Sequence, residues 1–130
     1  MDLLSVISIL DAEAVAAPPR PGLVEISSVF VGDLMSDVLS HACPDTLIVT
    51  ALCTSQPVRV AEVVDAPAVC FVQNKMPQQS VLELARSKGI VIIVTPYCAY
   101  RSSALLYRAG LQSAVRPVSP EGYNGGYLEI

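Results

Sequence analysis

The sequence lacks an excess of basic residues. Its 8 Lys and Arg are outnumbered by 12 Asp and Glu, which gives a net charge of -4 and a pI near 4.7. Proteins that bind phosphate backbones or anionic membranes present a basic face, so we expect neither nucleic acid nor a membrane as a partner. No apolar run reaches the roughly 18 residues of a membrane span. Asp2 stands where a secretion signal carries basic residues, and we therefore expect a cytoplasmic protein.

The patterns typical of metal sites are also missing. None of the four cysteines, Cys43, Cys53, Cys70 and Cys98, forms a C-x-x-C pair, and the lone His41 has no partner at a zinc-like spacing. We predict no metal site and no cofactor. Cys70 lies in an apolar run, where a free thiol behaves as a small hydrophobe, and the other three lie near the expected ends of elements. We expect four free thiols, with a disulfide or redox role as the alternative.

Motifs for nucleotide chemistry are absent, because neither G-x-x-x-x-G-K-S/T nor G-x-G-x-x-G occurs. A nucleophile at Cys53 or Ser55 needs a base, and His41 is expected at the far end of the helix that begins at Asp33. Asp33 and Asp37 are spaced to pair as acid and base, but Asp33 as the helix N-cap with Asp37 in solvent is the favoured interpretation. We expect a non-catalytic protein, with an enzyme using Cys53 or the two aspartates as an alternative.

Helix-like and strand-like segments alternate along the 130 residues, 52% of which are hydrophobic. That is enough chain for one domain with a real core. Unbroken apolar runs at 46–50, 68–72 and 90–94 are typical of parallel strands covered on both faces. We expect a single three-layer α/β domain with a mainly parallel sheet and helices on both faces. The other expected elements are strands at 12–16 and 26–31 and helices at 2–10, 34–42, 57–64, 77–88 and 100–109.

Three segments follow from this pattern. Residues 1–22, a helix, a strand and a proline-rich connector, are expected to belong to the same domain as the core at 23–112. Residues 113–130 form a C-terminal tail, expected to add an edge strand at 114–118 and then to wrap a neighbour or remain mobile. Because only 15% of the residues are charged, apolar surface must be covered somewhere. We expect a homodimer that uses the tail and the final helix.

Polar residues gather in the turns after the expected strands. Ligands of parallel sheets bind beyond the carboxyl ends of the strands, so these side chains are expected at one rim. Lys75 and Arg101 suit a phosphorylated or nucleotide ligand, although the favoured interpretation of Lys75 is an ordinary solvated turn residue. Tyr97 suits either base stacking or a subunit contact. The candidate ligand-binding residues are Asp33, Thr50, Cys53, Thr54, Ser55, Gln56, Asn74, Lys75, Thr95, Tyr97 and Arg101.

Two stretches, VFVGDLMSDVLSHA at 29–42 and the run at 45–111, resemble the DRTGG domain family. The strand-to-helix junction in the first stretch and the block RSKGIVIIVT in the second carry the resemblance. Similar members are small stand-alone DRTGG proteins of anaerobic bacteria, labelled HPr kinase-like, and the likeness to HPr kinase reaches at most its non-catalytic N-terminal domain. Related domains lie in phosphotransacetylases and between the CBS domains of regulated pyrophosphatases. The resemblance implies a bacterial protein with a regulatory or dimer-forming role.

The chain departs from this family at the turn ALCTSQ, residues 51–56, which stands where the Asp-Arg-Thr-Gly-Gly loop is expected. A small polar turn before a helix still offers free N–H groups to an anion, although Thr54 or Ser55 acting as a helix cap is the favoured interpretation of the turn itself. We therefore expect a regulatory module that binds a small anion, such as an adenine nucleotide, at the strand ends and acts through a dimer. The alternative is a protein–protein adaptor without a small ligand, in a hydrogenase or acetate-energy system.

Overall fold

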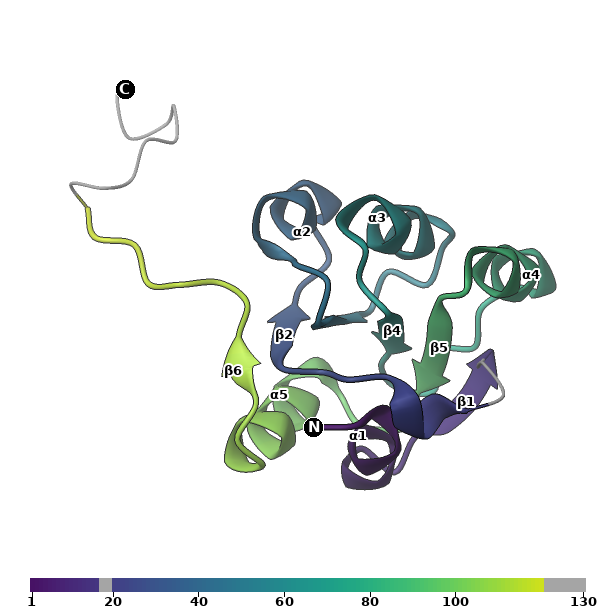
Figure 1. Cartoon of the computed structure of the whole chain (residues 1–130), viewed down its shortest axis with the longest axis horizontal. Helices are drawn as coiled ribbons and strands as arrows, with labels where there is room; N and C mark the ends of the chain where they lie inside the picture. Colours follow the sequence, from purple (N-terminus) through teal and green to yellow (C-terminus); the bar gives the residue numbers. More distant parts are fainter. Residues whose placement is uncertain (17–19, 121–130) are drawn as a thin grey trace.

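The computed structural model describes residues 1–16 and 20–120, which form one six-stranded sheet between two layers of helices (Figure 1). The strand order is β1-β5-β4-β3-β2-β6. The three-layer α/β fold expected from the sequence is confirmed. The strands are β1 (Glu13–Ala16), β2 (Ser28–Val31), β3 (Thr46–Thr50), β4 (Ala68–Phe71), β5 (Val91–Val94) and β6 (Gln112–Ser113). The helices are α1 (Leu3–Ile9), α2 (Met35–His41), α3 (Gln56–Val64), α4 (Gln79–Lys88) and α5 (Ala99–Arg108), with a 3₁₀ turn η1 at Pro21–Leu23.

The order of the parallel strands fixes the layer in which each helix lies. Strands β2, β3, β4 and β5 are parallel and adjacent in chain order. Crossovers between parallel strands are right-handed, so three successive steps in one direction place α2, α3 and α4 on the same face. After β5 the chain reverses direction, and α5 crosses the other face to reach β6 beyond β2. The helix α1 lies on the same face as α5 (Figure 1).

Each face of the sheet has its own hydrophobic core, because successive side chains of a strand point to opposite faces. Phe30 and Val69 pack with α2, α3 and α4, whereas Val29 and Val49 pack with α1 and α5. Seven residues in the apolar runs predicted to be strands covered on both faces are all buried, which confirms that prediction. They are Ile48, Val49, Val69, Phe71, Val91, Ile92 and Ile93.

The N-terminal helix and strand are bonded to the far edge of the sheet. Strand β1 pairs antiparallel with β5, and the Arg86 guanidinium donates a hydrogen bond to the Val15 carbonyl at 3.3 Å. The Thr95 hydroxyl, at the end of β5, donates to the Leu10 carbonyl at the end of α1 at 2.5 Å. Residues 1–16 are therefore part of the same sheet and the same cores.

The last strand differs from the prediction. An edge strand was expected at 114–118, but β6 is Gln112–Ser113 and pairs in parallel with Ser28 and Val29 of β2. Pro117 has no N–H with which to extend this pairing. The end of the predicted tail, residues 121–130, and the prolines at 18 and 19 of the predicted connector lie outside the described residues. Within the described part of the chain, no helix is long and apolar enough to cross a bilayer.

Candidate functional site

Asp33 bonds to the end of the neighbouring strand and does not cap its own helix. Its carboxylate accepts hydrogen bonds from the Thr50 hydroxyl at 2.9 Å and from the Ala51 N–H at 2.8 Å. The N-cap of α2 is Leu34, without a side-chain hydrogen bond, so the prediction that Asp33 caps this helix was wrong. The reason is long-range: β2 and β3 are parallel and in register, so the residues after β2 lie beside the end of β3. Asp33 and the buried Thr50 thus hold this turn in place.

The turns after β4 and β5 bond to each other. These strands are neighbours whose helices, α4 and α5, lie on opposite faces, and such a point is where an open α/β sheet usually binds its ligand. Here the Gln73 N–H donates to the Tyr97 carbonyl and the Asn74 N–H donates to the Thr95 carbonyl, both at 2.9 Å. The Thr95 hydroxyl is fully buried and also accepts from the Tyr97 N–H at 3.2 Å. Asn74, Thr95 and Tyr97 therefore fix the backbone at this point.

Arg101, expected to supply charge to a ligand, lies over an aromatic ring. Its guanidinium carbon is 4.9 Å from the centre of the Tyr97 ring, a cation–π contact that is worth about 0.5–1 kcal/mol at an exposed position. The contact joins the first turn of α5 to the turn after β5. Arg101 and Tyr97 thus interact with each other, and neither belongs to the residues that line the cleft described next.

The open cleft, of about 570 Å³, lies between the start of α3 and the start of α4. Four of the predicted ligand-binding residues line it, namely Cys53, Thr54, Ser55 and Lys75. Gln56 is the first residue of α3, next to this lining. The cleft also has four lining residues that the sequence interpretation missed: Met76, Gln78, Ser80 and Val81. A signal for them existed, because the expected helix at 77–88 begins two residues after Lys75 and its first residues belong to the same edge of the sheet.

Two helix N-termini open onto this cleft. Within residues 20–120, neither the N-cap of α3, Ser55, nor the N-cap of α4, Gln78, makes a side-chain capping hydrogen bond. The Thr54 hydroxyl accepts from the Gln56 N–H at 3.3 Å, so of the two predicted capping residues only Thr54 bonds to the start of α3. The first-turn N–H groups of a helix carry partial positive charge and favour an anion.

Lys75 adds a full positive charge to the same cleft. Its ammonium nitrogen lies 3.5 Å from the Ala51 carbonyl oxygen, a long contact with a neutral acceptor. In the described ranges 1–16 and 20–120, the ion pairs are Met1–Glu25 and Lys88–Glu62, and neither involves Lys75. Lys75 therefore has no carboxylate partner there, and no neighbouring side chain neutralises its charge.

Cys53 lacks the features of a nucleophile. Its thiol donates a weak hydrogen bond to the Lys75 carbonyl at 3.5 Å. Burial raises the pKa of the Cys53 thiol, and the charge of Lys75 offsets only part of this effect. Because the thiolate is the reactive form, a raised pKa lowers the reactivity of Cys53. His41 ends α2, at the opposite end of that helix from this rim, as the sequence predicted.

The strand order and the two helical layers define a three-layer α/β domain with a ligand-sized cleft at the carboxyl edge of its sheet. The structure is similar to the crystal structure of the CBS and DRTGG domains of the regulatory region of Clostridium perfringens pyrophosphatase, complexed with its activator diadenosine tetraphosphate. The TM-score is 0.65 at 17% identity, over 81% of this chain and 45% of that chain. This likeness supports the DRTGG-like domain that the sequence indicates. No family model and no curated protein matches the sequence.

Proposed function

We propose that this protein is a non-catalytic regulatory module that binds a small anion in the cleft between α3 and α4 and acts as a homodimer. The observation that carries the proposal is that two helix starts, whose N-cap side chains make no capping hydrogen bond, meet at one opening with Lys75, which has no carboxylate partner among the described residues. Each feature alone is common. Together they supply N–H donors and a cation around a single volume that suits a small ligand.

The chemistry of the lining favours a phosphate group. The hydroxyls of Thr54, Ser55 and Ser80 are donors, and no acidic side chain belongs to the cleft lining. The lining also contains no aromatic ring, so an adenine base would extend beyond the cleft while its phosphates occupy it. The cleft therefore fits the anionic part of a nucleotide, or a smaller phosphorylated compound, as its minimal ligand.

Titration calorimetry and thermal unfolding with inorganic phosphate, AMP and diadenosine tetraphosphate test this proposal. A ligand present at 100 times its dissociation constant stabilises the fold by about 2.7 kcal/mol. We expect Lys75→Ala to weaken binding by about 1.5–3 kcal/mol, since a charge-assisted hydrogen bond is lost. Lys88→Ala removes the same charge from the far end of α4 and serves as the control.

Two outcomes would count against the proposal. Equal affinity of Lys75→Ala and Lys88→Ala for a bound phosphate compound would place the site elsewhere. A measurable reaction that Cys53→Ala abolishes would replace the regulatory module with an enzyme. We expect Cys53→Ala to bind normally, because a thiol contributes little to holding an anion.

A protein–protein adaptor is the second candidate function. It is favoured by an apolar groove beside α5, whose rim includes the exposed Tyr100 and Tyr107. The absence of any stabilisation by the three phosphate compounds, together with a stable dimer in light scattering, would favour this alternative.

A further inference from the structure

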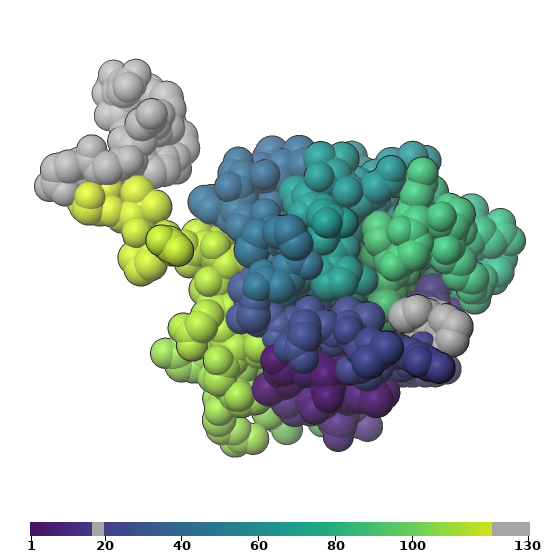
Figure 2. All heavy atoms as spheres, viewed as in Figure 1, coloured from purple at the N-terminus to yellow at the C-terminus, as the bar shows by residue number. Residues whose placement is uncertain are grey.

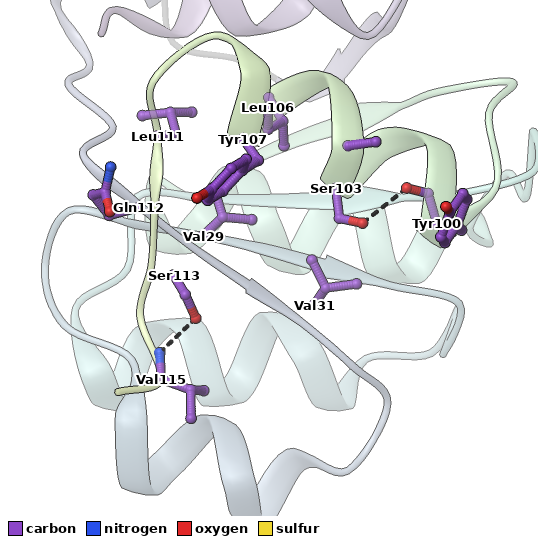
Figure 3. A pocket seen from close by; sticks show the side chains of 11 residues that line it. Val29, Val31, Tyr100, Ser103, Leu106, Tyr107, Leu111, Gln112, Ser113 and Val115 are labelled. Atoms are coloured by element: carbon purple, nitrogen blue, oxygen red, sulfur yellow. Dashed lines mark hydrogen bonds between the residues drawn. The ribbon is translucent and has the colours of Figure 1, made fainter. Parts of the chain in front are cut away.

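The groove beside α5 lies on the opposite face of the sheet from α3 and α4 and has a different chemistry. It has a volume of about 550 Å³ and is lined by α5, by β2 and by residues 111–115. Figure 3 shows Tyr107 and Leu106 of α5 on one side of the groove, and Val29 and Val31 of β2 on the other. None of its lining residues is charged. Tyr107 and Tyr100 are 73% and 84% exposed, so the large aromatic rings at this groove contact mainly solvent.

The groove ends at an incomplete edge of the sheet. Strand β6 pairs with β2 only at Ser28 and Val29. The last bond on this side runs from the Ala114 N–H to the Val29 carbonyl, at 2.8 Å. From there to Val31, the outer edge of β2 has no paired strand in the described part of the chain. Val31 itself lines the groove and is exposed. This edge therefore offers backbone hydrogen-bonding groups next to apolar surface, as in sites that take up an extended segment.

The elements around the groove carry only positive charge. Arg101 and Arg108 belong to α5, and Arg116 follows Val115 directly; the sequence has no Asp or Glu between residues 84 and 120. The suitable occupant is thus an extended, mainly apolar segment that carries acidic groups. Segment 121–130, EGYNGGYLEI, has this composition, with two tyrosines, a leucine, an isoleucine and two glutamates.

We propose that segment 121–130 of a second copy of the chain occupies the groove, so that two copies exchange their C-terminal segments. Residues 116–120 run outward from the body of the molecule rather than back toward α5 (Figure 2). The direction of residues 116–120 therefore favours a second copy, rather than the same copy, as the source of the segment that fills the groove. Each copy then offers one groove and one segment, and two identical contacts form about a two-fold axis. The inference rests on the dimer proposed above and specifies how that dimer is held together.

Isotope-mixed photo-crosslinking tests the exchange directly. Full-length Tyr127→benzoylphenylalanine is produced with natural and with heavy nitrogen, mixed in equal amounts, equilibrated and irradiated, and light scattering measures the mass in parallel. We expect a dimer, with crosslinks from position 127 to residues 99–116, and about half of the crosslinked pairs should join a heavy and a light chain. Crosslinks within one chain only would show that each groove holds its own segment and would overturn the exchange.

The mass measurement separates the failure of this inference from the failure of the proposed dimer. A dimer without crosslinks to residues 99–116 would overturn the exchange while the dimer stands, whereas a monomer at all concentrations would overturn both. Tyr107→Ala provides a second test: we expect it to raise the dimer dissociation constant by about tenfold or more. The matched control is Val63→Ala on α3, where the side chain is 74% exposed on the opposite face. An equal effect of the two substitutions would also overturn the proposal.

Discussion

Replacing Thr95 by valine should destabilise the protein strongly, although the two side chains have nearly the same shape. The Thr95 hydroxyl is fully buried, donates to the Leu10 carbonyl at 2.5 Å and accepts from the Tyr97 N–H at 3.2 Å. Valine fills the same volume but makes neither bond. The Leu10 carbonyl, at the C-cap of α1, and the Tyr97 N–H would then each lose a partner.

The expected loss follows from these two bonds. A buried donor or acceptor left without a partner costs about 1–3 kcal/mol, so the two groups together should lower the free energy of unfolding of Thr95→Val by about 2–6 kcal/mol. This is a large part of the roughly 5–15 kcal/mol by which proteins are stable. An unfolding entropy of about 2.1 cal/mol/K per residue converts a loss of about 3 kcal/mol into a fall of roughly 11 °C in Tm.

Urea unfolding followed by circular dichroism measures this loss, since the sequence contains no tryptophan to serve as a fluorescent probe. Thr95→Ser is the matched control, because it keeps the hydroxyl and removes only a methyl group, at a cost of about 1 kcal/mol. If Thr95→Val proves as stable as Thr95→Ser, the hydroxyl does not hold α1 to β5, and the reasoning fails.

Three further predictions concern single side chains. In urea unfolding, Asp33→Ala should lower the free energy of unfolding by about 1–2 kcal/mol, because two hydrogen bonds at the end of β3 are lost. Asp37→Ala, at a nearby exposed position, is the control and should change it by no more than about 0.5 kcal/mol. In thiol labelling, the exposed Cys98 should react in the native protein, whereas the buried Cys70 should react only after unfolding, because burial shields its thiol and raises its pKa to about 12. Equal labelling rates of the two thiols in the native protein would contradict this. Hydrogen bonds from the Ser27 hydroxyl and the Cys43 thiol lower the pKa of Asp45. The Asp45 carboxylate therefore adds stability above its unfolded pKa of about 3.9, and this contribution is lost as the pH falls below that value. Acid unfolding of Asp45→Asn should accordingly show a smaller loss of stability with falling pH than acid unfolding of the unmodified protein.

The sheet was predictable because its signal is local. Val69, Phe71 and Ile92 lie in runs whose composition alone indicates strands covered on both faces, and all three are buried. The helices between these strands were predictable for the same reason, within one or two residues at most of their ends. Neither the strands nor these helices depend, for their prediction, on contacts with residues far away in the sequence.

The rim was harder to predict because its polar residues have partners far away in sequence. Asp33 has a short side chain just before a helix, which locally favours an N-cap, yet Thr50 at the end of the next strand and Ala51 directly after it donate hydrogen bonds to Asp33 instead. Gln78 and Ser80 reach the cleft only because α4 starts beside α3, a placement set by tertiary packing. The groove beside α5 depends on the reversal of the chain after β5, which no local pattern specifies.

The bond between Thr95 and Leu10 also constrains the order in which the chain folds. It joins residues 85 positions apart, and β1 pairs Glu13 with Val94, whereas β2 pairs Ser28 with Thr46 only a helix away. Contacts of short sequence separation form at lower entropic cost, so the ladder from β2 to β5 is expected to form before β1 joins it. During synthesis, residues 1–16 are made before β2 to β5 but pair with the sheet only after β5, and until β5 has been made the core around Leu3 and Val6 lacks Val91 and Ile93.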